Sequence, residues 1–99
     1  MERSKDQIWG FVTEVHDGDT LTLKVTSQRR SNGYNYKDNE RVRLQGINAP
    51  ELGRPGGEAA KRRLAPLLNQ RVKCTIHGRD KYGRIVSDVV RAPSDRARR

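Results

Sequence analysis

Three short segments of the sequence bring acidic, basic and amide side chains close together: Asp17–Thr20 (DGDT), Arg43–Glu51 (RLQGINAPE) and Asp80–Arg84 (DKYGR). Carboxylates such as those of Asp19 and Glu51 are the hard oxygen ligands that calcium prefers. Arg43 and Arg84 carry forked guanidinium donors that match phosphate oxygens. Phosphodiester hydrolysis needs a water, a group that activates or orients it, and cations that neutralise the charge developing on the phosphoryl oxygens. The three segments together contain groups of each kind.

Each segment by itself also has a simpler explanation. Asp17 and Gly18 are typical of a hairpin turn, because glycine adopts positive φ without a steric penalty. Asp19 fits the start of a strand, and Arg43 and Arg84 fit solvated surface positions. Only the occurrence of all three segments together favours a site.

The composition predicts one small domain with a polyanionic partner. The chain has 99 residues and a net charge of +9, with 32% hydrophobic and 33% charged residues, so its core must be small. Excess positive charge favours nucleic acid over an anionic membrane as the partner, and solubility alone is the other explanation.

Cysteine and histidine usage argues against a disulfide or a zinc site. Cys74 has no cysteine partner within the chain, and His16 and His77 lack zinc-ligand spacing. We find no membrane-spanning run and no signal peptide. The chain as written is expected to be cytoplasmic, or secreted if a signal has been removed, so we assign no compartment.

Apolar alternation predicts strands, and a helical spacing of apolar residues predicts one helix. The expected strands cover residues 7–16, 20–26, 40–47, 71–77 and 84–90, and the helix covers residues 58–70. Pro66 should kink or shorten that helix. This order predicts a mainly β fold with one helix, a five-stranded barrel of the oligonucleotide-binding (OB) type.

The apolar phase of each element predicts one buried cluster. Its expected members are Trp9, Phe11, Leu21, Leu23, Val25, Val42, Leu44, Leu64, Leu68, Val72, Cys74 and Ile76. Residues 1–6 are expected to be an N-terminal extension, residues 7–91 the domain, and residues 92–99 a basic, frayed tail.

Residues 27–39 lack apolar periodicity and predict a long exposed hairpin loop. Tyr34 and Tyr36 lie there near arginines, so both are candidates for stacking against bases. Simple solvated disorder is the alternative for this loop.

The three polar segments resemble, in order, the DGDT, RLxGIDAPE and DKYGR signatures of the staphylococcal nuclease (thermonuclease) family. The resemblance runs from about Gly10 to Val90 and includes the helix opening GGEAAKRRL. Three signatures in register are far more specific than any one alone. The resemblance implies a five-stranded OB-fold barrel that cleaves DNA and RNA with calcium as cofactor and leaves 3′-phosphate ends.

The resemblance also implies roles for individual residues. Metal ligands would be the side chains of Asp19 and Asn48 and the backbone carbonyl of Ala49, whereas Glu51 would contact the metal through the attacking water. Asp17 would lie outside the first metal shell.

The remaining roles implied by the resemblance concern the substrate. Arg43 and Arg84 would act with Glu51 in catalysis by binding the charge of the transition state. Lys81 and Tyr82 would hold a terminal phosphate of the bound nucleotide.

Two departures from the family pattern predict a weakened activity. Asn48 stands where the family has an aspartate, so the site has one negative charge fewer for calcium. The family domain usually continues into two further helices, whereas this sequence ends about fifteen residues after Arg84. Those helices are expected to be absent, to lie outside this sequence, or to be replaced by another subunit, such as a second copy in a homodimer. A non-catalytic module of the same fold, binding nucleic acid or protein, is therefore the alternative function.

Overall fold

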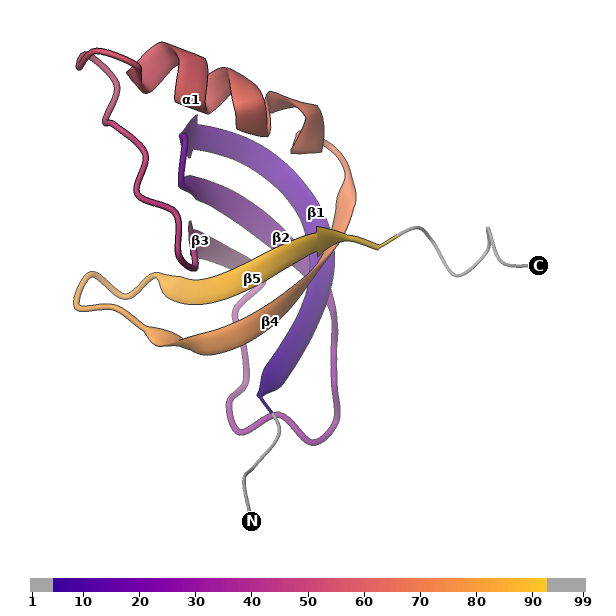
Figure 1. Cartoon of the computed structure of the whole chain (residues 1–99). Coiled ribbons are helices and arrows are strands. Elements are labelled where there is room, and N and C mark those ends of the chain that lie inside the picture. The colour runs from indigo at the N-terminus through magenta and orange to yellow at the C-terminus, as the bar shows by residue number, and fades with distance from the viewer. Residues whose placement is uncertain (1–4, 93–99) are drawn as a thin grey trace.

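Five strands close into a barrel in the order β1-β2-β3-β5-β4, in a computed structural model that describes residues 5–92 (Figure 1). All neighbouring strands are antiparallel except β3 and β5, which are parallel. The elements are β1 (Asp6–Asp17), β2 (Thr20–Gln28), β3 (Asn39–Leu44), α1 (Gly57–Leu64), a 3₁₀ turn (Ala65–Leu67), β4 (Arg71–Arg79) and β5 (Ile85–Arg91). The predicted fold class, a mainly β OB-like barrel with one helix, is confirmed.

The core fills the barrel, as most of the predicted apolar phases require. Leu21, Leu23, Val42, Val72 and Cys74 are fully buried. Leu44 and Ile76 are also buried, whereas Val25 is half-buried against the cluster, as are three residues outside the prediction: Val15, Leu67 and Val89.

The predicted phase of β1 is wrong. Ile8 and Val12 are fully buried, whereas Trp9 is only partly buried and Phe11 is 42% exposed. Gly10 lies between them at a register shift, where β1 approaches β2 so closely that a Cβ would lie 2.1 Å from the Lys24 carbonyl oxygen. The residues of β1 that face the core are therefore those in phase with Gly10, namely Ile8 and Val12, and not the aromatic residues Trp9 and Phe11.

The helix is shorter than predicted, and Pro66 explains why. α1 ends at Leu64, and the chain continues through the 3₁₀ turn that contains this proline, which has no backbone N–H to donate. The tighter turn places Leu67 against the core and leaves Leu68 42% exposed. Leu68 was predicted to be buried, and Leu64 is only half-buried.

The segment between β2 and β3 is an ordered loop with a buried tyrosine. Tyr36 is 8% exposed, belongs to the core cluster and donates a hydrogen bond from its hydroxyl to Asp6 Oδ2 (2.6 Å). Burial raises the pKa of Tyr36 well above its usual value, and the neighbouring Asp6 carboxylate raises it further. The prediction of Tyr36 as a stacking surface is therefore wrong, whereas Tyr34 is 72% exposed.

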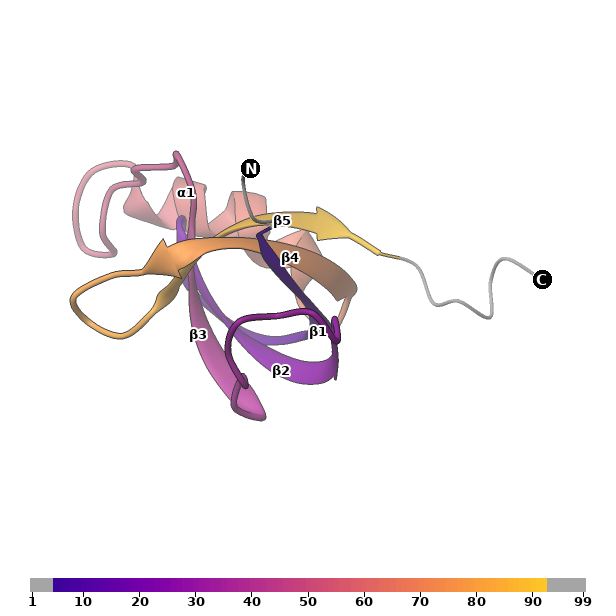
Figure 2. The ribbon, with the colours of Figure 1, turned by 90° about the horizontal axis from the view of Figure 1, so that it is seen from below.

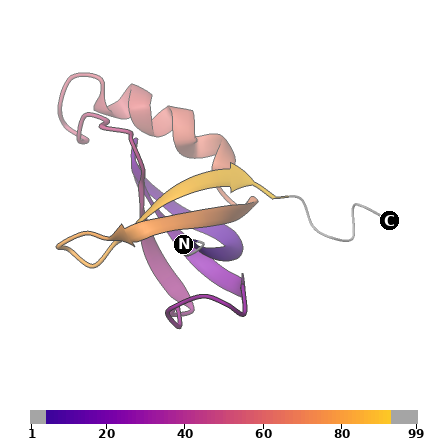
Figure 3. The ribbon, with the colours of Figure 1, turned by 60° about the horizontal axis from the view of Figure 1, so that its bottom comes forward.

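Different elements lie at the two ends of the barrel. α1 lies across one end, whereas the loop between β2 and β3 hangs below the other end, near the start of β1 (Figures 1 and 3). The β4–β5 turn projects sideways from the barrel (Figure 2). None of the helices within residues 5–92 is both long and apolar enough to cross a membrane.

The predicted domain limits agree only in part with the described elements. Asp6 belongs to β1 rather than to an N-terminal extension. Ala92 follows β5 directly, and its N–H donates to the Arg71 carbonyl oxygen (3.0 Å). The rest of the predicted extension and tail, residues 1–4 and 93–99, lies outside the described residues.

Candidate active site

The turn between β1 and β2 positions the first predicted acid. The Asp19 backbone N–H donates to Asp17 Oδ1 (3.0 Å), so Asp17 shapes the turn. Gly18 must be a glycine, because a Cβ there would lie 2.5 Å from the Cβ atoms of both Ala49 and Ala60. The turn therefore packs directly against the loop after β3 and against α1.

Asp19 is 8% exposed and is held by polar contacts. Its Oδ1 accepts a hydrogen bond from the Thr20 hydroxyl (3.0 Å), and its Oδ2 accepts one from the Ala49 N–H (3.0 Å). Burial alone would raise the pKa of Asp19. Interactions with the Asp17 side chain, with these two donors and with the Arg43 charge outweigh burial and hold the pKa below its usual value. Asp19 is thus an anion at neutral pH, as a carboxyl group must be in order to bind a metal.

Arg43 projects from β3 across the loop that follows it. Its guanidinium donates to the Leu44 carbonyl oxygen (2.9 Å), to the Ile47 carbonyl oxygen and to Asn48 Oδ1 (2.8 Å). The same group lies 3.6 Å from Asp19 Oδ2. Arg43 therefore contacts both side chains that were predicted to be metal ligands.

The β4–β5 turn presents Arg84 through a local carboxylate. Asp80 Oδ1 accepts the backbone N–H groups of Tyr82 (2.9 Å) and Arg84 (3.0 Å), while Asp80 Oδ2 accepts Arg84 Nε (2.7 Å). The other end of the Arg84 guanidinium lies 3.5 Å from the Thr20 hydroxyl, next to Asp19. Asp80 thus fixes both the turn and the direction of the arginine.

Lys81 and Tyr82 lie at the exposed tip of this turn. Tyr82 is 71% exposed, with Lys81 Nζ 5.3 Å and Arg84 Cζ 5.2 Å from its ring centroid. Both residues line a hollow shared with Arg43 and Asn48. Both residues thus lie beside the arginines, and their contact with a phosphate of the nucleotide stays a prediction.

One pocket unites the predicted catalytic and metal-binding residues. Its walls come from the β1–β2 turn, the loop after β3 and the β4–β5 turn, and comprise His16, Asp17, Asp19, Arg43, Asn48, Ala49, Glu51, Leu52 and Arg84. Glu51 is exposed on this wall. Tyr34 and Tyr36 do not line this pocket, so the structure does not bring them to the site.

The donor set suits a hard cation. Asp19, Asn48, Ala49 and Glu51 offer only oxygen donors within the pocket, which is what calcium requires. Within residues 5–92 there is no group of three or more His, Cys, Asp or Glu side chains placed to hold a metal ion. In a calcium shell built from these donors, an amide oxygen and a backbone carbonyl would join the carboxylates, and the charge of the donor set would be low.

Sequence reasoning missed two residues of the site. Asp80 was given no role, although its place four residues before Arg84 in a turn is a recognisable Asx pattern. His16 lines the pocket, with its Nε2 2.7 Å from the Thr22 hydroxyl and its Nδ1 3.6 Å from Glu14. Nothing in the sequence indicated that His16 faces the site, because the end of β1 is irregular in register.

The sequence profile of a known family, described as Staphylococcal nuclease homologue, matches residues 41–97, more than half of the chain. The chain belongs to the staphylococcal nuclease family. The matched region contains two of the three polar segments, Arg43–Glu51 and Asp80–Arg84. The third segment, Asp17–Thr20, precedes the matched region and is brought to the same pocket by the closure of the barrel.

Curated proteins that are named as nucleases resemble most of this chain. A protein named Probable endonuclease LCL3 from Ajellomyces dermatitidis is 37% identical over 106 residues, covering 86% of this chain and 35% of the relative. A protein named Micrococcal nuclease from Shigella flexneri is 40% identical over 85 residues, covering 85% of this chain and 42% of the relative. This chain therefore spans less than half the length of either relative.

Proposed function

We propose that this chain is a calcium-dependent nuclease that hydrolyses phosphodiester bonds of DNA, RNA or both. The observation that carries the proposal is the meeting of Asp19, Arg43, Glu51 and Arg84 in one pocket, from three separate segments. Relatives named as nucleases support the same activity. The net charge of +9 favours an anionic polymer as substrate.

Each side chain has a distinct part in the proposed reaction. Glu51 is exposed in the pocket, where its carboxylate can accept a proton from, or orient, the attacking water. Arg43 from β3 and Arg84 from the β4–β5 turn both line the pocket and stabilise negative charge on the phosphoryl oxygens in the transition state. Asp80 is a positioning residue, since it holds Arg84 rather than the substrate.

Asp19, Asn48 and the Ala49 carbonyl would hold the calcium, with Glu51 contacting it through water. Bound there, the cation would neutralise charge on the phosphate and let two carboxylates coexist with an anionic substrate. Cleavage at the 5′-oxygen side, which leaves 3′-phosphate ends, is the expected outcome by family resemblance.

A non-catalytic nucleic-acid-binding module of the same fold is the second candidate. The observation in its favour is that Asn48 Oδ1 accepts a hydrogen bond from Arg43, so this oxygen is engaged within the protein. Under this alternative the arginines bind phosphates and no bond is cleaved.

Degradation of a fluorescent DNA and a fluorescent RNA, followed with calcium, with magnesium and with chelator, tests the proposal. We expect calcium-dependent cleavage by the wild-type chain and a loss of about 100-fold or more in rate for Glu51→Gln. Binding in chelator should change little, because the substitution keeps the size of the side chain.

Glu58→Gln is the matched control, since Glu58 is an exposed acid in the first turn of α1 and lies outside the pocket. It should cleave like the wild type. Wild-type rates in Glu51→Gln would refute the role of Glu51, and binding without cleavage by the wild type would favour the non-catalytic module.

A further inference from the structure

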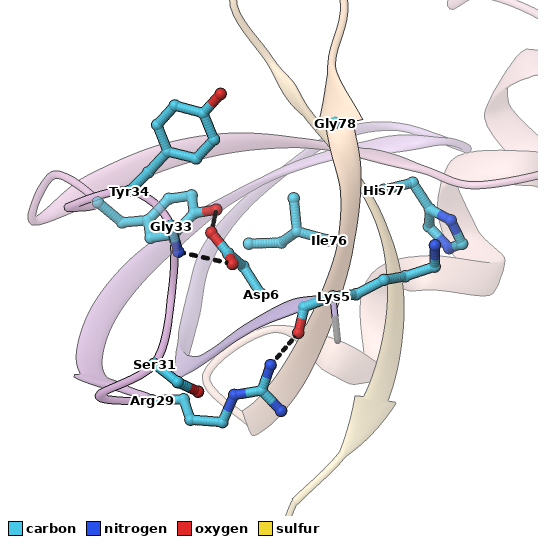
Figure 4. Close-up of a pocket in the computed structure, with 10 residues that line it drawn as sticks. Lys5, Asp6, Arg29, Ser31, Gly33, Tyr34, Ile76, His77 and Gly78 are labelled. Atoms are coloured by element: carbon cyan, nitrogen blue, oxygen red, sulfur yellow. Dashed lines mark hydrogen bonds between the residues drawn. The ribbon is translucent and has the colours of Figure 1, made fainter. Parts of the chain in front are cut away.

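A second hollow lies between the start of β1, the end of β4 and the loop that joins β2 to β3 (Figure 4). Lys5 and Arg29 bring permanent positive charge to its lining, and His77 adds a third basic group. His77 is paired, with its Nε2 3.1 Å from Asp88 Oδ2. None of the predicted catalytic or metal-binding residues lines this hollow.

The one carboxylate in the lining is engaged internally. Asp6 Oδ1 accepts the Gly33 N–H (2.8 Å), and Asp6 Oδ2 accepts the Tyr36 hydroxyl (2.6 Å). Arg29 is satisfied only in part: it donates to the Lys5 carbonyl and to Gln7 Oε1 (3.4 Å), while its buried Nε has no hydrogen-bond partner among the described residues. Lys5 and Arg29 outnumber this one carboxylate in the lining, so the hollow presents net positive charge and suits an anionic group.

The β2–β3 loop, which borders the hollow, is held by hydrogen bonds on both sides of Tyr34. Asn32 exchanges two hydrogen bonds with the Gln7 backbone (2.9 and 2.8 Å). Tyr36 exchanges two with the Gln28 side chain (3.0 and 3.1 Å). Residues on either side of Tyr34 are thus fixed to β1 and β2, so little entropy is lost when a ligand binds this loop.

Tyr34 presents an aromatic ring that the fold does not bury. The side chain is 72% exposed, and its ring meets Tyr36 edge-on, with centroids 6.4 Å apart and planes at 69°. This contact sets the direction of the ring while leaving its surface to solvent. Nucleic-acid bases stack on such rings without regard to sequence.

Contacts through Arg79 connect this hollow to the turn that carries Arg84. Arg79 Cζ lies 5.8 Å from the centroid of the Tyr36 ring, and Arg79 donates to the Gly83 carbonyl oxygen (2.7 Å). Gly83 belongs to the turn that carries Arg84, and the hollow itself is lined by Ile76 to Gly78, just before this turn. Arg79 therefore contacts both a residue that lines the hollow, Tyr36, and the turn that carries Arg84.

We infer that this hollow is a second contact site for single-stranded nucleic acid, in which a base stacks on Tyr34 and a backbone phosphate lies beside Lys5 and Arg29. The inference rests on the proposed function for the continuity of the strand with the nuclease site. A single strand fits better than a duplex, because stacking on Tyr34 requires an unpaired base.

Fluorescence anisotropy in chelator measures this binding without cleavage. The probe is a labelled oligothymidine of about 12 nucleotides. Tyr34→Ala should weaken its binding by about 5- to 100-fold, the usual effect of losing one stacking platform. Tyr34→Phe keeps the ring and should restore binding, and Asn35→Ala, an exposed neighbour outside the hollow, should bind like the wild type.

The charge is tested separately through the salt dependence of binding. Lys5→Gln should lower the slope of log affinity against log salt by about 0.7, the value for one phosphate contact on a single strand. Lys24→Gln removes the same charge from an exposed site outside the hollow and should leave the slope unchanged.

Wild-type affinity of Tyr34→Ala for oligothymidine would overturn the inference, as would equal losses for oligothymidine and a duplex of the same length. Loss of binding in Tyr34→Phe equal to that in Tyr34→Ala would also overturn it, because the ring would then not be the contact. Suppose that the wild type shows no cleavage and that Tyr34→Ala still loses affinity. The nuclease proposal then fails, whereas the inference of a second binding site is supported. If the wild type cleaves and Tyr34→Ala binds normally, only the hollow fails.

Discussion

Two arginine–carboxylate groups in this barrel have opposite designs. Arg79 forms a bidentate pair with Glu40, with distances of 3.1 and 3.0 Å, and the Glu40 side chain is only 4% exposed. Arg84 uses only its Nε for Asp80, and the rest of its guanidinium faces the pocket beside Thr20. The closed pair satisfies itself, whereas the open one leaves donors for a ligand.

The closed pair also joins parts of the fold that are distant in sequence. Glu40 lies on β3 and accepts the Lys37 N–H (2.9 Å), while Arg79 at the end of β4 donates to Gly83 in the next turn. Arg79 uses both of its terminal nitrogens for Glu40, whereas Arg84 keeps terminal donors that face the pocket and can bind an anion. We therefore expect the same two residue types to serve stability in one region and phosphate chemistry in the other.

The largest expected difference between the two regions comes from matched Arg→Lys substitutions. Arg84→Lys should lower the cleavage rate by about 100- to 1000-fold, because the pocket loses a forked donor for the transition state. Its unfolding midpoint should stay near that of the wild type. Arg79→Lys should do the reverse, with nearly normal cleavage per folded molecule and a lower midpoint. Cleavage rates and thermal unfolding midpoints measured on both variants test this prediction. Equal losses of rate would show that the two arginines do not differ in role.

A smaller effect is expected from neutralising the closed pair. Glu40→Gln should lower the free energy of unfolding by about 1–2 kcal/mol, since charged hydrogen bonds are replaced by neutral ones while Arg79 stays partly solvated. Denaturant titration at neutral pH measures the loss. Thr22→Val, on the neighbouring strand, controls for a general effect of losing a polar group from the barrel wall. If this control lowered the free energy of unfolding as much as Glu40→Gln does, the Arg79–Glu40 pair would contribute no more to stability than any other polar group of the wall.

The same variant makes a prediction about pH. Burial alone would raise the pKa of Glu40, but hydrogen bonds from Arg79 and the Lys37 N–H, with their charges, hold it below its ordinary value of 4.5. A lowered pKa in the folded state contributes stability above the unfolded-state pKa and loses it as pH falls through the folded-state pKa. The stability gap between wild type and Glu40→Gln should therefore be constant near neutral pH and shrink below pH 4.5. A gap that persists unchanged at lower pH would contradict the pairing.

The smallest expected effect concerns the charge of the open site. Asn48→Asp restores a third acidic group around the proposed calcium position, so half-maximal cleavage should need about three- to tenfold less calcium. Two effects oppose this: repulsion of the anionic substrate, and a stronger pairing of the new carboxylate with Arg43. Calcium titration of cleavage at constant salt measures the balance, with Asn35→Asp as a control for net charge. An unchanged or higher calcium requirement would mean that Asn48 is not a ligand.

The sequence predicted the barrel because its strands alternate clearly where one face is buried. Leu21, Leu23 and Val42 alternate with polar residues, and each is fully buried. In residues 8–12, by contrast, apolar side chains occupy both phases around Gly10, so periodicity alone could not choose between them. The close approach of β2 to this glycine belongs to the closed barrel and is absent from any local pattern.

The candidate site also has one part that the sequence predicts and another that depends on tertiary packing. The types and spacing of the residues in the three polar segments pointed to phosphodiester chemistry, because local turns and strand ends determine what each segment can present. How the side chains of the three segments lie relative to one another depends on tertiary packing. Gly18 lets the β1–β2 turn press against Ala49 and Ala60, and this contact places the carboxylate of Asp19 against the backbone of the loop after β3.

By itself, then, the sequence determined the fold class, the polar segments and the sign of the charge, all of which follow from local periodicity, residue type and composition. Tertiary structure alone decided that Tyr36 is buried while Tyr34 is exposed, although both lie in one polar, aperiodic loop. The reason is that the hydroxyl partner of Tyr36, Asp6, lies 30 residues away and becomes a neighbour only when β1 and the loop meet at the end of the barrel. Contacts between such distant residues leave no trace in the local pattern.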